Sequence, residues 1–333
     1  MSSPVIRAID VGYGHTKFVL QANEREIECG IFPSLAVAAT RAAQCDGVLE
    51  KRRTHVVEAD GIAFEVGPDV VLIKDSEHGS PLHENYAKSS EYLALARGAL
   101  GQMNQRTIDL LMVGLPLSLM GTKRSELRQR LEGEHPLPDR GHCTVRRVRV
   151  LPQPLGGLVH HYYGDFAAHR DETNLIIDVG MFTVDWLLTH GMREIPESSG
   201  SENVGVHRIL KRVAEAIGEE HHISFTNLRH VDRQLGSGRI KLYGIDHDVK
   251  RHISAAQDEL FATLHGLAND IGDGRKIDNV FLVGGGSSLF EPIIERILPK
   301  HRIHTVADPV FANVRGFQLV GTAFSRPRCD SAA

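Results

Sequence analysis

The sequence predicts an α/β fold made of two related halves, with smaller inserted subdomains. The chain has 333 residues, which is long enough for two compact domains. Apolar runs typical of strands alternate along it with amphipathic segments typical of helices. A strand, a glycine-containing turn and a second strand occur near the N-terminus and recur 168 residues later, counted from Asp10 to Asp178, with the same Ile-Asp-Val-Gly core. A repeat at that separation indicates two related halves and not a solenoid, whose period is about 20 to 50 residues.

In the first half, the pattern at 5–21 predicts a hairpin whose turn contains Gly12 and Gly14. Short apolar runs between 33 and 83 predict a small strand-rich insert. A helix is expected at 89–103, because Ser89 or Ser90 can cap it and apolar residues then recur at helical spacing. The other elements expected here are strands at 108–115 and 144–151 and helices at 123–131 and 155–163.

In the second half, 174–189 predicts the second hairpin. An apolar strand is expected at 280–283, directly before three consecutive glycines. Amphipathic spacing predicts the helices. They are expected at 206–217, 226–235, 246–268, 289–298 and 313–324.

Composition excludes several classes of protein. Lys and Arg number 38 against 42 Asp and Glu, and the formal net charge of −4 argues against broad binding to a nucleic-acid backbone. The cysteines form no CxxC pair, which disfavours a zinc ribbon or a disulfide framework; they are Cys29, Cys45, Cys143 and Cys329. No basic region followed by a long apolar stretch opens the chain, and no apolar run reaches about 18 residues, so we expect a cytoplasmic protein that does not enter a membrane.

The turn of the first hairpin has the residues of a phosphate-binding loop. Asp10 ends an apolar strand, and Gly12 and Gly14 follow it. Glycines let backbone N–H groups converge on an anion, and Lys17 could reach back to the same anion. The Asp10 carboxylate could hold a hydrated Mg²⁺, which binds one or two carboxylates together with waters and phosphate oxygens. The alternative is a plain hairpin turn with a capping aspartate.

The second hairpin repeats this layout with Asp178, Gly180 and Thr183. Two such loops facing each other across a cleft could clamp a polyphosphate from both sides, with Asp10 and Asp178 flanking one cation. The repetition is more specific than a single glycine-rich loop.

Two further segments are candidates for ligand contact. Gly284, Gly285 and Gly286 lie between a strand and a helix, where a backbone without side chains can approach a ligand and the helix N-terminus adds partial positive charge. The alternative is a tight strand-to-helix turn. Gln153 lies between two prolines, and an amide held there could orient a water molecule, although a Pro-Gln-Pro segment is often only a turn.

Taken together, these motifs resemble the nucleotide-binding motifs of the actin superfamily. All five motifs of that superfamily occur, in its order and over nearly the whole chain: DVGYGHTK at 10–17, LPQPLGG at 151–157, DVGMFTVD at 178–185, VGGGS at 283–287 and ANVRG at 312–316. Within the superfamily the chain most resembles the plasmid-segregation actin-like proteins of the ParM/StbA type and their archaeal and bacterial relatives.

The resemblance implies two RNase-H-like domains flanking a nucleotide cleft. We expect domain I over 1–158 plus 317–333, with an insert at about 33–83, and domain II over 159–316, with an insert at about 211–250. It also implies Mg²⁺-dependent hydrolysis of ATP, or of GTP, and polymerisation into filaments that position DNA. The partners would be further copies of the chain and a DNA-binding adaptor protein, with no direct binding to nucleic acid.

The resemblance also implies roles for individual residues. Asp10 and Asp178 would hold the hydrated Mg²⁺, and Gln153 would orient the attacking water. The phosphates would contact Gly12, Tyr13, Gly14, Thr16 and Lys17 on one side and Gly180, Met181, Phe182 and Thr183 on the other. The nucleoside would contact Gly284, Gly285, Gly286 and Ser287, with Gly205 near the ribose. Asp232, Arg233 and Gln234 are guesses for the base.

Two positions depart from the family pattern. Met181 and Phe182 replace small residues or glycine, which carries a cost wherever the loop needs a positive φ angle. Tyr13 stands where a small hydroxyl residue is frequent.

Two other functions stay open on the same fold. One is a sugar or small-molecule kinase, although no sugar-binding cluster is evident. The other is a scaffold ATPase that does not polymerise. Arg146, Arg147 and Arg149 in the expected strand at 144–151 are interpreted as a solvated or subunit-contact face.

Overall fold

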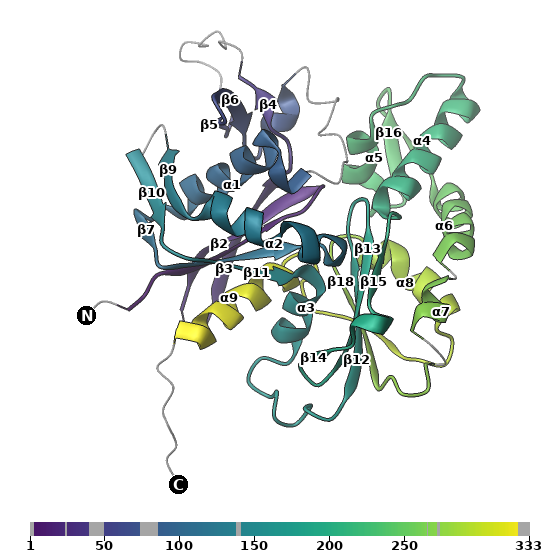
Figure 1. The fold of residues 1–333 in the computed structure, drawn as a ribbon. Helices are drawn as coiled ribbons and strands as arrows, with labels where there is room; N and C mark the ends of the chain where they lie inside the picture. The colour runs from purple at the N-terminus through teal and green to yellow at the C-terminus, as the bar shows by residue number, and fades with distance from the viewer. Residues whose placement is uncertain are drawn as a thin grey trace. The chain divides into compact units, whose positions relative to one another are not determined.

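A computed structural model describes residues 3–23, 25–39, 50–73, 86–137, 141–264, 266–271 and 274–325. The chain divides into two compact units (Figure 1). Unit 1 comprises Met1–Tyr163 and Phe311–Ala333, and unit 2 comprises Gly164–Val310. These limits differ by a few residues from the expected ones, because the whole of the closing helix packs in unit 1.

Unit 1 is built on a five-stranded sheet with the order β11-β8-β1-β2-β3. Strands β1, β8 and β11 are parallel, whereas β2 is antiparallel to both of its neighbours. The strands are β1 (Ile6–Val11), β2 (His15–Ala22), β3 (Ile27–Pro33), β8 (Leu110–Leu115) and β11 (Val148–Pro152). The parallel central strands carry continuous apolar runs because both faces of the sheet are covered.

Successive side chains of β1 pack alternately into two cores, one on each face of the sheet. Ile9 and Val11 join a core that includes residues of α1, while Ile6 and Ala8 join a separate core that includes residues of α9. The helices of unit 1 are α1 (Ser90–Met103), α2 (Leu117–Leu131), α3 (Gln153–His161) and α9 (Ala312–Ser325). As expected, the Ser89 side chain caps α1 by accepting a hydrogen bond from the backbone N–H of Tyr92.

Smaller sheets complete unit 1. One has the order β4-β6-β5 and lies within the expected strand-rich insert at 33–83, of which 40–49 and 74–83 lie outside the described residues. The other has the order β7-β10-β9. Their strands are β4 (Val37–Ala38), β5 (His55–Ala59), β6 (Ile62–Val66), β7 (Thr107–Ile108), β9 (Gly133–Leu137) and β10 (Gly141–Val145), and short 3-10 helices are η1 (Val70–Leu72) and η3 (Tyr86–Lys88).

Unit 2 contains a sheet with the order β14-β13-β12-β18-β19, and β15 also pairs with β13. Its strands are β12 (Thr173–Val179), β13 (Val184–His190), β14 (Arg193–Glu194), β15 (Gly200–Glu202), β18 (Asn279–Val283) and β19 (Ile303–Thr305). The helices are η4 (Pro196–Ser198), α4 (Val206–His221), α5 (Leu228–Leu235), α6 (Lys250–Leu264), α7 (Gly266–Asp270) and α8 (Ser287–Ile297). Apolar residues of β12, β18, α4, α6 and α8 share one core.

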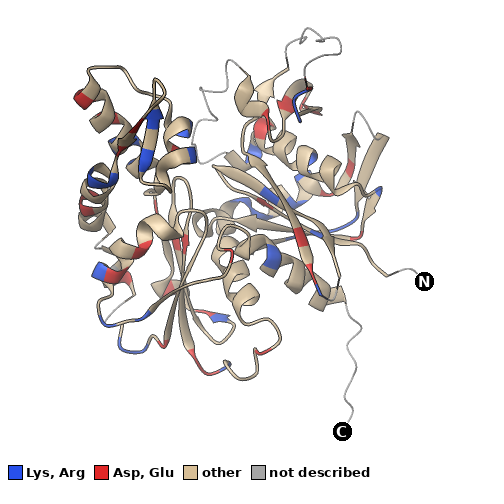
Figure 2. Ribbon diagram, turned by 180° about the vertical axis from the view of Figure 1, so that it is seen from behind, with Lys and Arg blue, Asp and Glu red and all other residues tan. Residues whose placement is uncertain are grey.

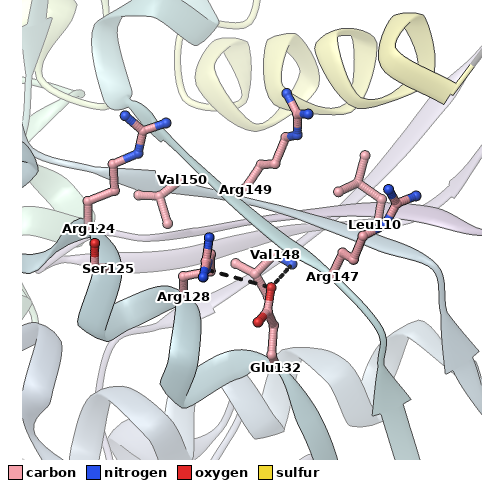
Figure 3. Close-up of a pocket in the computed structure, with 9 residues that line it drawn as sticks. All are labelled: Leu110, Arg124, Ser125, Arg128, Glu132, Arg147, Val148, Arg149 and Val150. Carbon is pink, nitrogen blue, oxygen red and sulfur yellow. Dashed lines mark hydrogen bonds and ion pairs between the residues drawn. The ribbon is translucent and has the colours of Figure 1, made fainter.

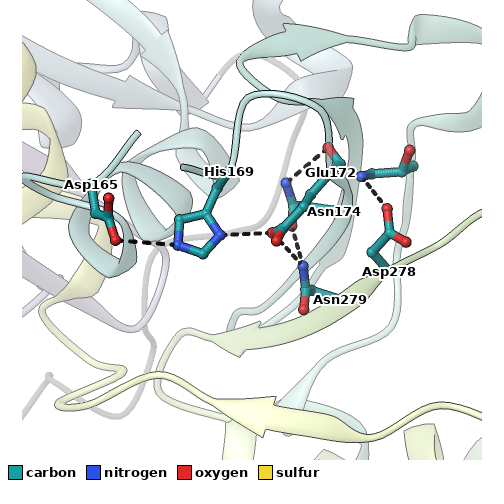
Figure 4. A network of polar contacts seen from close by, with 7 residues as sticks. Asp165, His169, Glu172, Asn174, Asp278 and Asn279 are labelled. Atoms are coloured by element: carbon teal, nitrogen blue, oxygen red, sulfur yellow. Dashed lines mark hydrogen bonds and ion pairs between the residues drawn. The ribbon is translucent and has the colours of Figure 1, made fainter. Parts of the chain in front are cut away.

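A polar network fixes the start of β12 in unit 2 (Figure 4). Glu172 lies 2.9 Å from His169 Nδ1 and accepts a hydrogen bond of 2.9 Å from the amide of Asn279. The same amide donates to Asn174 at 3.0 Å, and Asp278 accepts from the backbone N–H of Thr173 at 2.7 Å. These bonds join β12 to β18 at the end of the sheet away from the turn at 180–183.

Four of the expected elements were wrong in extent or type. The strand expected at 108–115 is divided, because Ile108 belongs to β7 in the small sheet and β8 begins at Leu110. Residues 245–248 form β17 (Ile245–Asp248), paired with β16 (Arg239–Leu242), and α6 begins only at Lys250, whose N–H bonds the Asp248 side chain. The strand expected at 144–151 is two strands, because the chain passes from the sheet of β10 to that of β11 at Arg146 and Arg147. Helix α2 starts directly after Pro116, six residues before the expected start.

Within the described ranges, no helix combines the length and apolar character needed to cross a bilayer.

Candidate nucleotide-binding site

The first hairpin has the geometry expected of its glycine turn. Asp10 lies opposite Lys17 in the antiparallel register of β1 and β2, and the backbone N–H of Gly12 donates to the carbonyl of His15 at 3.2 Å. The Asp10 side chain is buried at the end of β1. The turn is therefore closed by backbone bonds, and its aspartate faces the interior of unit 1.

Two side chains hold the Asp10 carboxylate. Lys17 Nζ lies 3.3 Å from Oδ2, and the amide of Gln153 donates a 2.6 Å hydrogen bond to Oδ1. Gln153 is the first residue of α3 and is 8% exposed, so it is a positioned helix residue and not part of a free turn. Because its NH₂ group donates to Asp10, its Oε1 is the atom that can accept a hydrogen bond from a water molecule.

A glycine that the sequence analysis did not select makes room for this carboxylate. A Cβ atom on Gly114, near the end of β8, would lie 2.9 Å from Asp10 Oδ1 and 2.6 Å from the ring of Phe317. No local pattern marks Gly114, and only the sheet order, which puts β8 beside β1, reveals its role.

The side chains of Tyr13 and Thr16, two further candidates in the first hairpin, are directed into unit 1. The Tyr13 ring stacks on Tyr86 with centroids 4.8 Å apart, and Tyr86 meets Tyr92 edge-on. Thr16 is fully buried, and its hydroxyl shares a 2.9 Å hydrogen bond with Ser34. Their side chains anchor the loop, so its backbone is the part that can bind an anion.

A small cavity of about 20 Å³ lies beside the loop. It has room for about one water molecule. Its lining includes Gly12, Tyr13, Gly114 and Gln153. Of the site residues chosen from the sequence, those that the structure brings together in unit 1 are thus Asp10, Gly12, Tyr13, Lys17 and Gln153.

The second hairpin repeats the backbone pattern. The N–H of Gly180 donates to the carbonyl of Thr183 at 2.9 Å, as the N–H of Gly12 does in the first loop. Asp178 lies opposite Asp185 across the two strands, and both side chains are buried. Thr183 Oγ1 donates to Asp185 Oδ2 at 3.0 Å. Asp185 was read only as part of the motif, and its place beside Asp178 follows from the hairpin register.

The N-terminus of α4 holds the second loop in place. The backbone N–H groups of Val206 and His207 donate to the carbonyls of Gly180 and Met181 at 3.1 and 2.8 Å. A Cβ on Gly205 would lie 2.6 Å from the Met181 backbone, so the loop and helix approach each other too closely for a side chain there. Gly205 therefore has a packing role that its sequence position did not reveal.

The departures from the family pattern leave the loop backbones unstrained. Tyr13, Met181 and Phe182 are all described residues, and none of them has a positive φ. Met181 packs against the core of unit 2, and the Phe182 ring lies 4.6 Å from that of His207. Burial, with lesser effects of Lys211 and Arg208, lowers the pKa of His207.

The three glycines after β18 differ from one another. Gly284 has φ of +89°, and a Cβ there would collide with Asp178 Oδ1. Gly286 donates its N–H to the Val179 carbonyl at 3.0 Å and would clash with Val206 if it carried a side chain. Around Gly285, the described residues leave the position of a Cβ open. Gly285 is therefore the member of the triplet with space for a ligand.

Two groups of candidates have other contacts in unit 2. Ser287 is 1% exposed, and its hydroxyl donates to the Gly284 carbonyl at 2.8 Å, which closes the turn before α8. Gln234 accepts from the N–H of Lys241 at 2.8 Å and so joins α5 to β16. Burial raises the pKa of Asp232 on the same helix.

The carboxylates present fit a hydrated Mg²⁺. Among the described residues there is no group of three or more His, Cys, Asp or Glu side chains arranged to hold a metal. Mg²⁺ does not need such a group, because it keeps several waters and takes one or two carboxylates together with substrate phosphates. Asp10 and Asp178 are each the second-last residue of a strand that leads into a glycine turn, which is consistent with that donor set.

Comparisons with known proteins agree with these motifs. The family model of the N-terminal domain of actin-like proteins matches residues 8–156, and that of the archaeal MreB-like actin homologue, C-terminal part, matches residues 176–296. A search of curated protein sequences found no match.

Solved structures of similar fold are of actin homologues. Ta0583, an archaeal actin homologue, matches with a TM-score of 0.77 and 20% identity over 96% of this chain and 99% of that one. The same homologue in complex with ADP gives 0.72 and 20% over 96% and 99%. A ParM filament from Clostridium botulinum gives 0.76 and 20% over 97% of this chain and 100% of that one. The chain therefore belongs to the actin superfamily, among its archaeal and bacterial actin-like proteins, and has the two-domain actin fold.

Proposed function

We propose that the protein binds ATP or GTP with Mg²⁺, hydrolyses it, and polymerises into filaments that segregate plasmids or other DNA in the cytoplasm. The observation that carries this proposal is the arrangement at the first loop, where Lys17 and Gln153 converge on Asp10 beside a glycine turn. The same backbone turn follows Asp178. Support also comes from Ta0583, an actin homologue solved with ADP.

Each loop would contribute its backbone to the phosphates. Gly12, Tyr13 and Gly14 would supply N–H groups from unit 1, and Gly180 to Thr183 would do so from unit 2. Thr16 and Ser287 would act by shaping the backbone, because their hydroxyls are used inside the protein. Gly285 would lie against the nucleoside, since its surroundings are open. We further propose that Gly205 lies near the ribose and that Asp232, Arg233 and Gln234 lie near the base. The placement of Gly205 rests on the resemblance to the actin superfamily.

The chemistry of hydrolysis would rest on three side chains. Asp10 and Asp178 would hold a hydrated Mg²⁺, and the ion would supply positive charge to offset that of the phosphates. Gln153, fixed by its bond to Asp10, orients the attacking water through Oε1. Lys17 balances the charge of Asp10 and lies close enough to the glycine turn to bind a phosphate oxygen.

Self-association would produce the filament, and a DNA-binding adaptor would connect it to its cargo. A ParM filament and an Alp12 filament are among the solved structures similar to this chain. The net charge of −4 favours contact with DNA through an adaptor.

Sedimentation and light scattering with ATP, GTP or ADP plus Mg²⁺ test the proposal, together with phosphate release. We expect polymer with a triphosphate and about 100-fold slower hydrolysis for Gln153→Ala, with nucleotide affinity largely retained. Asp178→Ala should abolish hydrolysis. Absence of polymer with every nucleotide, combined with transfer of phosphate to a sugar, would contradict the proposal.

A further inference from the structure

A groove in unit 1 lies between α2 and the edge of the large sheet, and its lining includes none of the residues proposed to bind nucleotide (Figure 3). Its volume is about 440 Å³, which is within the range of ligand-binding pockets. The groove is lined by Leu110, Arg124, Ser125, Arg128, Glu132, Arg147, Val148, Arg149 and Val150. Figure 3 shows Arg124 and Arg128 extending from α2. Arg147 and Arg149 extend from the segment opposite, which is β11 and the residue before it.

The groove carries an excess of positive charge. Four arginines line it with a single acidic residue, and arginine stays protonated in proteins. Glu132 is already engaged, because its Oε1 accepts a 3.0 Å hydrogen bond from the Val148 N–H and lies 3.9 Å from Arg128 Nε. Arg149 lies over the Phe324 ring at 4.1 Å. Arg124 and Arg147 form no ion pair with the part of the chain that the structure describes.

Several basic residues near the groove are instead paired with acidic ones. Just outside it, Arg146 pairs with Asp109 at 2.8 Å, Arg130 with Asp60, and Lys88 with Glu126 at 2.6 Å. Lys and Arg are interspersed with Asp and Glu over the ribbon (Figure 2). Duplex nucleic acid needs a basic stripe that follows its backbone. A short acidic ligand needs only a local cluster, so the charge distribution favours the short ligand.

The side chains of the groove are more available to a ligand than its backbone is. β11 is the last strand in the order of its sheet, so one of its edges has no strand partner among the described residues. On that edge the Val148 N–H is already donated to Glu132, so the edge does not offer a full row of donors to an added strand. Leu110, Val148 and Val150 are at most 4% exposed, so the arginines supply most of the accessible lining.

We propose that this groove binds a short acidic peptide segment of a partner protein, held by the arginine side chains. Carboxylates of the peptide pair with Arg124 and Arg147, because an arginine fork matches a carboxylate in two hydrogen bonds. The segment therefore carries several closely spaced carboxylates, and the groove includes none of the residues proposed to bind nucleotide.

The test uses the full-length protein and a fluorescein-labelled decapeptide of alternating Glu and Val, with binding followed by fluorescence anisotropy. We expect saturable binding that weakens with added salt and is absent for the matching Lys-Val peptide. Arg124→Ala combined with Arg147→Ala should weaken binding at least about tenfold. Arg146→Ala is the matched control, because this neighbouring arginine is paired with Asp109 and lies outside the groove.

Nucleotide affinity and the circular dichroism spectrum of the double variant show that it is folded, since none of its changes touches the nucleotide residues. Failure of the wild-type protein to bind the peptide would overturn the proposal. Loss of binding to a DNA duplex in the double variant, without peptide binding, would assign the groove to nucleic acid. A higher concentration threshold for polymerisation, again without peptide binding, would assign it to a second copy of the chain.

Discussion

The two glycine hairpins share a backbone but are stabilised differently. In each, an aspartate is the second-last residue of the first strand, and the glycine two residues later donates its N–H to a carbonyl three residues further on. Around Asp10, long side chains supply the contacts, namely Lys17 and Gln153. Around the second loop, a Thr183–Asp185 hydrogen bond is combined with close packing at two glycines, Gly284 against the Asp178 carboxylate and Gly205 against the loop backbone.

The difference shows that one short motif can be held by side-chain hydrogen bonds or by the absence of side chains. The first loop should therefore tolerate added volume better than it tolerates loss of polar groups. The second loop should show the opposite sensitivity, because backbone atoms cannot move aside as the tip of a lysine can.

The largest effect is expected at the glycine triplet of unit 2. Gly284→Ala forces a residue with a Cβ into a positive φ and against Asp178, so we expect a loss of at least about 3 kcal/mol in the free energy of unfolding. Gly285→Ala is the matched control, with a change within about 0.5 kcal/mol, since the surrounding described residues leave its Cβ position open. Urea denaturation followed by circular dichroism measures both. Equal losses for the two variants would refute this account of the triplet.

The next effect compares the two loops directly. Gly205→Ala should cost about 2 kcal/mol, because the new Cβ would lie 2.6 Å from the Met181 backbone. Gly12→Ala should cost less than about 1 kcal/mol, because its Cβ would lie 3.2 Å from the His15 carbonyl and 3.6 Å from the flexible tip of Lys17. Urea midpoints rank the pair, and a larger loss at Gly12 would reverse the comparison.

A smaller effect is expected from the aromatic anchor of the first loop. Tyr13→Ala removes the stack on Tyr86, and the stacking itself is worth about 0.5 to 1.5 kcal/mol. Tyr163→Ala is the control, because that ring is 51% exposed. Thermal unfolding of both variants measures the difference, and an unchanged melting temperature for Tyr13→Ala would show that the stack does not stabilise the loop.

The smallest effect is a dependence on pH that belongs to the second loop. Burial holds the pKa of His207 below its usual value, so the unfolded chain takes up this proton first. Its contribution to stability is complete above about pH 6.5 and declines as the pH falls through that value toward the lower folded pKa. His207→Gln should therefore reduce the loss of stability between pH 7.5 and pH 5.5. An identical pH profile in the variant would remove His207 from this account.

Local patterns were enough to predict much of the fold. The Ile-Asp-Val-Gly repeat predicted both hairpins, which the structure confirms at β1–β2 and β12–β13. The capping serine and the apolar spacing predicted α1 correctly. These features depend on residues within a few positions of one another, where the periods of strand and helix act directly on the chain.

Tertiary structure decided how the site is supported. Gln153 reaches Asp10 across 143 positions of sequence, and Gly114 makes room for the same carboxylate only because β8 is the neighbour of β1. The sequence predicted a ligand-binding loop at the triplet 284–286, but two of its glycines are needed for packing inside unit 2. The arginine groove likewise joins three separate segments of unit 1. Sequence spacing determines which side chains share a local face, but sheet order and helix packing decide which distant atoms meet, because those contacts depend on the whole fold.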